Sequence, residues 1–196
     1  MPNIPISEKE QQAWDFAKEL HKDQVRKFSN LPYFDAHVQK VNGTTKQYTT
    51  DEDLLCASLL HDTLEDCYDN KWEGYSIIKH KFGKRVADIV LELTSDEGEM
   101  KHRYEGSKKN YLIHKMIHMS DDALIVKLCD RLQNISDAFT ASEKFRNKYF
   151  DETTGIVEAI ESERNLNNIH IKILTDIKAK LDNIESIFKI KRFKDL

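Results

Sequence analysis

The sequence predicts an all-α protein, and three observations support that fold class. Proline, the strongest helix breaker, occurs only at positions 2, 5 and 32, so the long remainder of the chain contains none. Apolar residues recur every three or four positions, as they do on the buried face of a helix. Ser7 with Glu10, and Thr50 with Asp53, have the spacing of capping boxes, which begin helices.

In the N-terminal half, the predicted helices are separated by short breaks. The first helix is expected to run to about Lys27, where "FSNLPY" interrupts it. A short helix is expected near Asp35, followed by a loop over residues 42–50, "NGTTKQYTT". The second capping box then opens the helix that carries "LLHDTLEDC", residues 59–67.

The rest of the chain is expected to be helical with one long interruption. Helices are predicted over residues 70–82, 84–95, 108–119 and 121–138, with one or two long helices within 155–190. Gly83 is expected to close the first of these as a C-cap. The stretch 96–107 is polar and contains glycine, so it is predicted to be a mobile loop.

Composition narrows the classes of function. The chain has 196 residues and a formal charge of −4, which argues against a nucleic-acid-binding coat but permits a local basic patch for a small anion. Its three cysteines form no Cys-x-x-Cys pair, which favours reduced thiols in the cytoplasm. We expect no signal peptide, no membrane span and no nucleic-acid partner. The sequence gives no indication of oligomeric state.

Four ionisable side chains stand close together in "LLHDTLEDC". On a helix, His61 lies one turn before Glu65. Asp62 likewise lies one turn before Asp66, so both pairs face one side. At about 4 Å and an effective dielectric of about 20, each pair of like charges costs roughly 4 kcal/mol. A cation or a raised carboxyl pKa would relieve this repulsion, and a metal ion would also bind the imidazole. A solvated charged helix face is the alternative.

A metal site needs further ligands from other segments, and two candidates stand out. His37 follows "LPYFDA", and Asp130 lies among apolar residues in "IVKLCDRLQNISDA". Taken alone, His37 is expected to be an ordinary satisfied histidine. Asp130 alone is expected to pair with the neighbouring Lys127 or Arg131.

Taken together, these residues follow the order His … His-Asp … Asp of the HD phosphohydrolase superfamily. The segments "RKFSNLPYFDAH", "LLHDTLEDC" and "VKLCDRLQNI", with "FG" at 82–83, resemble the hydrolase domain of the RelA/SpoT family, especially the small alarmone hydrolases. The resemblance runs from about residue 11 to about residue 150. It implies an all-α HD-domain helical bundle over residues 1–150, with residues 151–196 as C-terminal helices packed on the same domain or, alternatively, forming an oligomer interface.

The resemblance also implies a metal site and a catalytic pair. One divalent ion, typically Mn²⁺, would be bound by His37, His61, Asp62 and Asp130. Glu65 and Asp66 match the pair that handles the attacking water, and spacing does not say which of them is the base. The chain departs from the family at one point: "PYFDAH" has one residue more before the histidine than the usual Pro-Tyr-x-x-His.

Substrate contacts are implied less directly. The resemblance assigns substrate binding to Arg26, Lys27, Lys108, Lys109, Asn134 and Tyr149. Arg26 would lie by the nucleobase and Tyr149 would close the nucleoside pocket. The two lysine positions at 108–109 match basic residues near the pyrophosphate. For the four basic residues, solvated surface charges are the alternative.

The function implied is hydrolysis of the stringent-response alarmone ppGpp, releasing pyrophosphate from the 3′ position to leave GDP, or GTP from pppGpp. The chain is too short for a synthetase domain as well, so hydrolysis without synthesis is expected. The same site would also suit an NADPH 2′-phosphatase or another nucleotide phosphohydrolase. A nucleotide-binding sensor without turnover is a third interpretation, which the intact Glu65–Asp66 pair disfavours.

Overall fold

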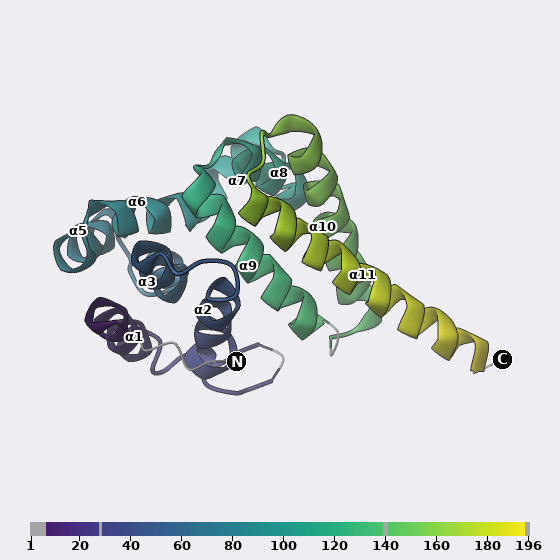
Figure 1. The fold of residues 1–196 in the computed structure, drawn as a ribbon, viewed down its shortest axis with the longest axis horizontal. Helices are drawn as coiled ribbons and strands as arrows, with labels where there is room; N and C mark the ends of the chain where they lie inside the picture. The colour runs from purple at the N-terminus through teal and green to yellow at the C-terminus, as the bar shows by residue number, and fades with distance from the viewer. Residues whose placement is uncertain (1–6, 28, 139–140, 195–196) are drawn as a thin grey trace. The chain divides into compact units, whose positions relative to one another are not determined.

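The computed structural model describes residues 7–27, 29–138 and 141–194, and within them it confirms the all-α fold class (Figure 1). The chain divides into two compact units. The first comprises Met1–Glu97 and Met119–Lys127, and the second comprises Gly98–His118 and Leu128–Leu196. The predicted division at residue 150 stays a prediction, and residues 1–6 and 195–196 of its two parts lie outside the described residues.

The first unit is built mainly from helices that precede residue 94. They are α1 (Glu8–Leu20), the π-helix η1 (Phe34–Val38), α2 (Gln39–Thr45), α3 (Glu52–Leu60), α4 (Thr63–Asp66), α5 (Lys71–Phe82) and α6 (Lys84–Leu93). Gly83, with φ of 92°, ends α5 as predicted, because only glycine adopts this backbone conformation without strain.

Helix α3 is the centre of this unit. Every residue from Leu54 to Leu60 is buried, and the helix packs against α1, α2 and α6; Figure 1 shows it beside α6. Its N-cap is Asp51 rather than the predicted Thr50: the Asp51 carboxylate accepts the backbone N–H groups of Asp53 and Leu54 at 3.0 and 3.2 Å. A carboxylate caps better here because Arg85 of α6 binds it as well, at 2.9 Å.

Two predicted boundaries in this unit are wrong. Helix α1 ends at Leu20 rather than near Lys27, because buried His21 turns the chain and its Nδ1 lies 2.7 Å from the Gln24 side-chain oxygen. The predicted loop at residues 42–50 begins later, since α2 continues to Thr45. The Asn42 side-chain nitrogen lies within 3.2 Å of three oxygens from α1 and α3, which keeps this polar residue inside the buried turn.

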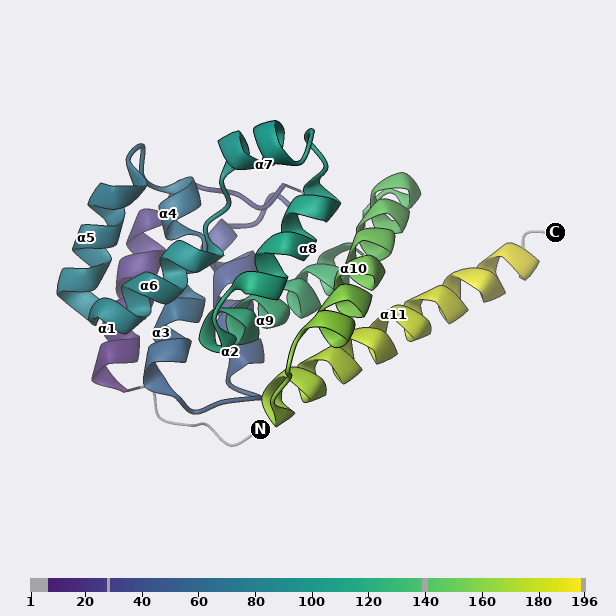
Figure 2. The same cartoon turned by 90° about the horizontal axis from the view of Figure 1, so that it is seen from above.

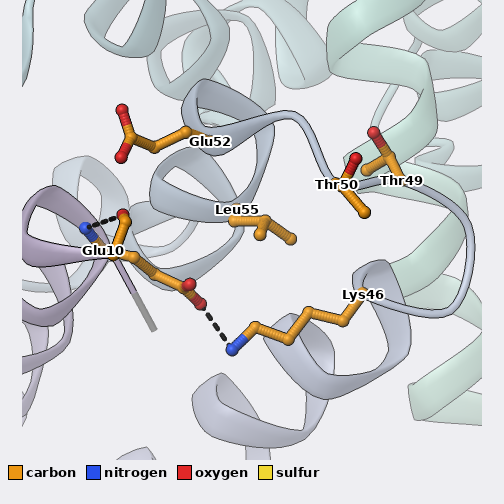
Figure 3. Close-up of a pocket in the computed structure, with 7 residues that line it drawn as sticks. Glu10, Lys46, Thr49, Thr50, Glu52 and Leu55 are labelled. Atoms are coloured by element: carbon orange, nitrogen blue, oxygen red, sulfur yellow. Dashed lines mark hydrogen bonds and ion pairs between the residues drawn. The ribbon is translucent and has the colours of Figure 1, made fainter. Parts of the chain in front are cut away.

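A buried carboxylate joins α1 to α2. Glu10 is only 2% exposed, and its carboxylate lies 2.7 Å from the Lys46 ammonium (Figure 3) and 3.1 Å from the Asn42 amide. The hollow beside this pair, which Thr49, Thr50 and Glu52 help to line, holds about 90 Å³. This volume is well below the roughly 300 Å³ at which small-molecule sites begin, so the ion pair is part of the framework.

The second unit contains the remaining helices: α7 (Glu97–Arg103), α8 (Lys108–His118), most of α9 (Asp121–Ala138), α10 (Glu143–Glu163) and α11 (Asn168–Lys194). Helix α8 packs along α10 (Figure 2). Helix α10 begins earlier than predicted because the Ser142 hydroxyl accepts the N–H of Phe145 as an N-cap. The prediction of a loop over the whole of 96–107 is wrong, since α7 forms with a 2.8 Å ion pair between Glu99 and Arg103, one turn apart.

A buried ion pair links α9 to α10. The Arg131 guanidinium donates to Glu152 at 3.0 Å and to the Thr153 hydroxyl at 2.9 Å, and it lies over the ring of Tyr149. Arg131 and Glu152 are both less than 9% exposed. If either residue were removed, water could not fully solvate the charge of the other.

Among the described residues, no helix has both the length and the apolar character needed to cross a bilayer.

We predict that Arg85→Met lowers the stability of the fold at pH 7 more than at pH 3. Burial raises the pKa of Asp51, but the hydrogen bond and charge of Arg85, together with the backbone hydrogen bonds from Leu54 and Asp53, outweigh it and lower the pKa below its ordinary value. The stabilisation is therefore present above about pH 4 and is lost as the pH falls through the lowered pKa. At pH 7 we expect a loss of about 1 kcal/mol in urea unfolding, the upper end for exposed pairs.

The matched control is Lys84→Met, because Lys84 pairs with Asp88 inside its own helix, where an exposed pair contributes little. Equal effects of the two substitutions, or an Arg85→Met effect that is the same at both pH values, would contradict the role of Arg85.

Candidate active site

Two histidines and an aspartate of the first unit converge on one point. The Nε2 atoms of His37 and His61 lie 3.3 Å apart. One carboxylate oxygen of Asp62 lies 2.8 Å from the His61 Nε2 and 3.5 Å from the His37 Nε2. Both histidines are almost completely buried. Three ligand atoms within 4.8 Å of one another form a candidate metal-binding group.

The hydrogen bonds around His61 determine what this group can bind. Its Nδ1 lies 2.8 Å from the backbone oxygen of Ser58. Because that oxygen can only accept, the Nδ1 must carry a proton, and a neutral ring then presents an unprotonated Nε2 to the cluster. Facing lone pairs and a carboxylate repel one another unless a proton or a cation lies among them. A proton on the His37 Nε2 would relieve this repulsion, and so would a divalent ion, whose preferred ligands include imidazole and carboxylate.

Burial raises the pKa of Asp62, but the attraction of His61 and His37 outweighs it and holds the pKa well below its ordinary value. The Asp62 carboxylate is therefore ionised at neutral pH, as a metal ligand must be. It also accepts the hydroxyl of Tyr33 at 2.5 Å, which fixes its orientation.

The predicted single helix through residues 59–67 is wrong. Helix α3 ends at Leu60, Asp62 has φ of −100°, and the short helix α4 begins at Thr63. The Thr63 hydroxyl donates to the Leu60 oxygen at 2.7 Å, which satisfies one of the carbonyls that the helix end exposes. The break separates His61 and Asp62 from Glu65 and Asp66, which then occupy the following turn.

The additional residue before His37 has a structural counterpart. Residues Phe34–Val38 form a π-helical turn, in which the chain holds more residues per turn than an α-helix does. A π-turn is the usual result of inserting one residue into an α-helix, and it leaves the flanking turns in register. The turn thus absorbs the insertion, and the His37 ring packs edge-on against His61, with centroids 5.2 Å apart.

Glu65 and Asp66 both reach solvent beside the cluster. The Glu65 carboxylate accepts the backbone N–H of Ser95 at 2.8 Å, so it is tied to the segment after α6. Although the Asp66 side chain reaches solvent, its partial burial raises its pKa to about 6, helped by the negative charges of Asp62 and Glu65. A carboxylate with this pKa is ionised at neutral pH but more basic than usual, as a general base requires.

Sequence reasoning did not identify two supporting residues, Tyr33 and Gln24. Tyr33 orients Asp62 and lies one turn before His37, a spacing that could have indicated it. The Gln24 amide donates to the backbone oxygen of Asp66 at 3.1 Å, and its own oxygen is held by His21. Tyr33 lies inside the quoted segment "RKFSNLPYFDAH" and Gln24 lies two residues before it, but only the folded chain connects them to the cluster.

Arg26 lies near this cluster through Tyr33. Its guanidinium carbon is 5.5 Å from the centre of the Tyr33 ring, and its backbone N–H donates to Leu31 at 2.8 Å within the loop after α1. Lys27 follows on the exposed side of the same loop. Arg26 is thus placed where a substrate at the cluster could meet it, and the role of Lys27 stays a prediction.

The other predicted residues belong to the second unit, and their roles in the site stay predictions. The Asn134 amide donates to the Asp130 carboxylate at 2.6 Å, so the two residues act together on α9. Asp130 and Arg131 are neighbours, but the Arg131 guanidinium is bound to Glu152 and stacked on Tyr149.

Of the two predicted lysines, Lys109 has a clear structural role. Its ammonium lies 2.9 Å from the Asp151 carboxylate, and its side chain covers Gly155, where a Cβ would meet the lysine Cε at 2.5 Å. Lys109 therefore helps to pack α8 on α10. Lys108 is exposed.

A larger hollow of about 600 Å³ adjoins Glu65 in the first unit. Its size suits a nucleotide-sized ligand. Three carboxylates line it, from Glu65, Asp69 and Glu97, against the single ammonium of Lys71. This charge balance disfavours a phosphate group, so the hollow is not assigned to an anionic substrate.

Comparison with known proteins relates this geometry to a family. Residues 13–160 match the family described as HD domain. The chain is 36% identical over 153 residues to a guanosine-3′,5′-bis(diphosphate) 3′-pyrophosphohydrolase of Aquifex aeolicus; the match covers 76% of this chain but 20% of that protein. The chain therefore spans about a fifth of the length of that bacterial relative.

Other relatives have a length similar to this chain. A Xenopus tropicalis protein named guanosine-3′,5′-bis(diphosphate) 3′-pyrophosphohydrolase MESH1 is 30% identical over 184 residues, covering 88% of this chain and 90% of the relative. A solved structure described as "A metazoan ortholog of SpoT hydrolyzes ppGpp and plays a role in starvation responses" matches with a TM-score of 0.70 and 26% identity. That match covers 93% of this chain and 96% of the other.

We predict that His61→Ala weakens Mn²⁺ binding by at least about 100-fold, because it removes a central nitrogen ligand from the cluster. Binding is measured by calorimetry and by electron paramagnetic resonance of free Mn²⁺. His102→Ala, which alters an exposed histidine of α7, is the control and should bind as the unaltered chain does. Circular dichroism establishes that each variant is folded. Unchanged affinity in a folded His61→Ala protein would rule out the metal site.

Proposed function

The chain belongs to the HD-domain family, and from this premise we propose that it is a metal-dependent hydrolase that removes the 3′-pyrophosphate of ppGpp and pppGpp. The observation that carries the proposal is the convergence of His37, His61 and Asp62. The carboxylates of Glu65 and Asp66 follow on α4, within four residues of Asp62. The substrate is inferred from relatives of similar length that are named for this activity.

We propose Mn²⁺ as the ion and Asp130 as its fourth protein ligand. Two imidazoles and two carboxylates form a mixed nitrogen and oxygen set that suits a borderline-hard ion. The hydrogen bond from Asn134 would orient the Asp130 carboxylate for this role. When bound, the ion would lower the pKa of a coordinated water and polarise a phosphoryl oxygen.

The reaction consumes one water per nucleotide. The water oxygen forms a bond to the phosphorus attached to the 3′ oxygen, and the bond between that phosphorus and the 3′ oxygen breaks. The products are pyrophosphate and GDP, or GTP from pppGpp, and the 3′ oxygen ends as a hydroxyl. The role of base is assigned to the Glu65–Asp66 pair, of which the pKa of about 6 favours Asp66 as the group that takes the proton of the water. That proton balances the one that the departing 3′ oxygen gains.

Basic and aromatic side chains would hold the nucleotide. Arg26, already beside Tyr33, can stack on the purine and meet phosphate, because its guanidinium is both planar and charged. Lys27, Lys108 and Lys109 would attract the pyrophosphate, Lys109 only by exchanging its bond to Asp151. Asn134 would contact the ribose or a phosphate, and Tyr149 would close the nucleoside pocket. We expect the protein to work in the cytoplasm, where this nucleotide is found.

The substrate is tested by a panel of ppGpp, pppGpp, NADPH, a deoxynucleoside triphosphate and a cyclic nucleotide, each with Mn²⁺. We expect pyrophosphate and GDP from ppGpp at the highest kcat/KM. Phosphate released mainly from NADPH would identify a 2′-phosphatase that uses the same site. Binding of ppGpp without any product would identify a sensor, and either result would overturn the proposal.

Two sets of substitutions separate catalysis from metal binding. Asp66→Asn should lower kcat by about 100-fold or more while Mn²⁺ still binds, because the general base is lost. Glu65→Gln should lower it less, and the double variant should be the slowest. Asp130→Ala should instead weaken Mn²⁺ binding. Equal turnover in the Glu65→Gln, Asp66→Asn double variant would remove the role of the pair.

A further inference from the structure

Four of the eight histidines are buried, and the other four, at positions 80, 102, 114 and 118, are exposed. His80 and His102 have no histidine three or four positions away. His114 and His118 differ, because they lie one helical turn apart on α8 in the segment "HKMIH". Residues four apart on a helix project from the same face, so these two rings are neighbours.

The geometry of the pair brings the rings together. Their centroids are 4.2 Å apart and their planes are inclined by 30°. The buried residues of α8 are Tyr111, Leu112 and Met116, so the pair stands on the face that α8 presents to solvent. The neighbouring cation of Lys115 lies over the ring of Tyr111, 5.7 Å from its centre, rather than over the histidines.

One hydrogen bond sets the second ring for metal binding. The Nδ1 of His118 lies 2.7 Å from the backbone oxygen of His114. That oxygen can only accept, so the Nδ1 carries the proton and the Nε2 of a neutral ring keeps its lone pair. Histidines that bind metals commonly donate their other ring nitrogen to a backbone carbonyl in this way. His118 is also the last residue of α8, where the helix dipole favours a cation.

We propose that His114 and His118 form a second metal site, which chelates a borderline divalent ion such as Zn²⁺, Ni²⁺ or Cu²⁺. The two imidazoles supply two ligands, and water completes the coordination. A site with only nitrogen ligands binds Cu²⁺ more tightly than Zn²⁺, and it binds both far more tightly than Mn²⁺. This site is thus distinct in chemistry from the cluster at His37, which adds carboxylate, and it does not depend on the proposed function.

The test uses the full chain carrying His61→Ala and Asp62→Ala, so that the first cluster no longer competes for metal. Zn²⁺ alone is titrated by calorimetry, and the histidine ring signals are followed by NMR. We expect one Zn²⁺ per chain, with the signals of residues 114 and 118 shifting together. Adding His118→Ala should weaken binding by about 100-fold, because the second ligand no longer acts at high effective concentration.

Matched variants distinguish chelation from simple loss of a histidine. His80→Ala removes an exposed histidine from the last turn of α5 and should change nothing. His118→Ala combined with Lys115→His keeps two histidines on α8 but turns them to different faces, and it should not bind. His118→Ala combined with Asn110→His rebuilds the spacing one turn earlier and should restore binding. Equal Zn²⁺ affinity with and without His118, or no rescue by Asn110→His, would overturn the proposal.

Discussion

The folded chain holds three electron-pair donors so close together that a proton or a cation must lie among them. The nitrogens of His37 and His61 face each other at 3.3 Å, and the Asp62 carboxylate adjoins both. The Ser58 carbonyl fixes a proton on the Nδ1 of His61, so the Nε2 of a neutral ring faces the cluster with its lone pair. The first unit supports this arrangement, because every residue of α3 from Leu54 to Leu60 is buried directly before His61.

Irregular backbone, rather than regular helix, places the reactive groups. The π-turn at Phe34–Val38 accommodates an additional residue and still presents His37 to His61. The interruption after Leu60 gives Asp62 its own direction and moves the Glu65–Asp66 pair to a following turn. Such departures cost local stability and persist where surrounding contacts determine them, which is typical of functional sites.

Several charged residues outside the cluster bind other side chains of the fold. In the second unit, Arg131 forms an ion pair with Glu152 and lies over the ring of Tyr149, and Lys109 forms an ion pair with Asp151. The adjacent residues on α9, Asp130 and Asn134, bond to each other. A basic residue near a family motif can therefore be part of the framework, and its contacts distinguish this case from a residue that is available to a ligand.

The sequence by itself determined the all-α class, the C-cap at Gly83, the helix at 121–138 and the types of residue in the cluster. These depend on periodicity and on neighbours within one or two turns. The tertiary structure decided that Asp51 rather than Thr50 caps α3, because Arg85 arrives from α6. It also decided that α1 stops at Leu20, and that Tyr33 and Gln24 support Asp62 and Asp66. These features require contacts between segments distant in the chain, whose energies no local pattern contains.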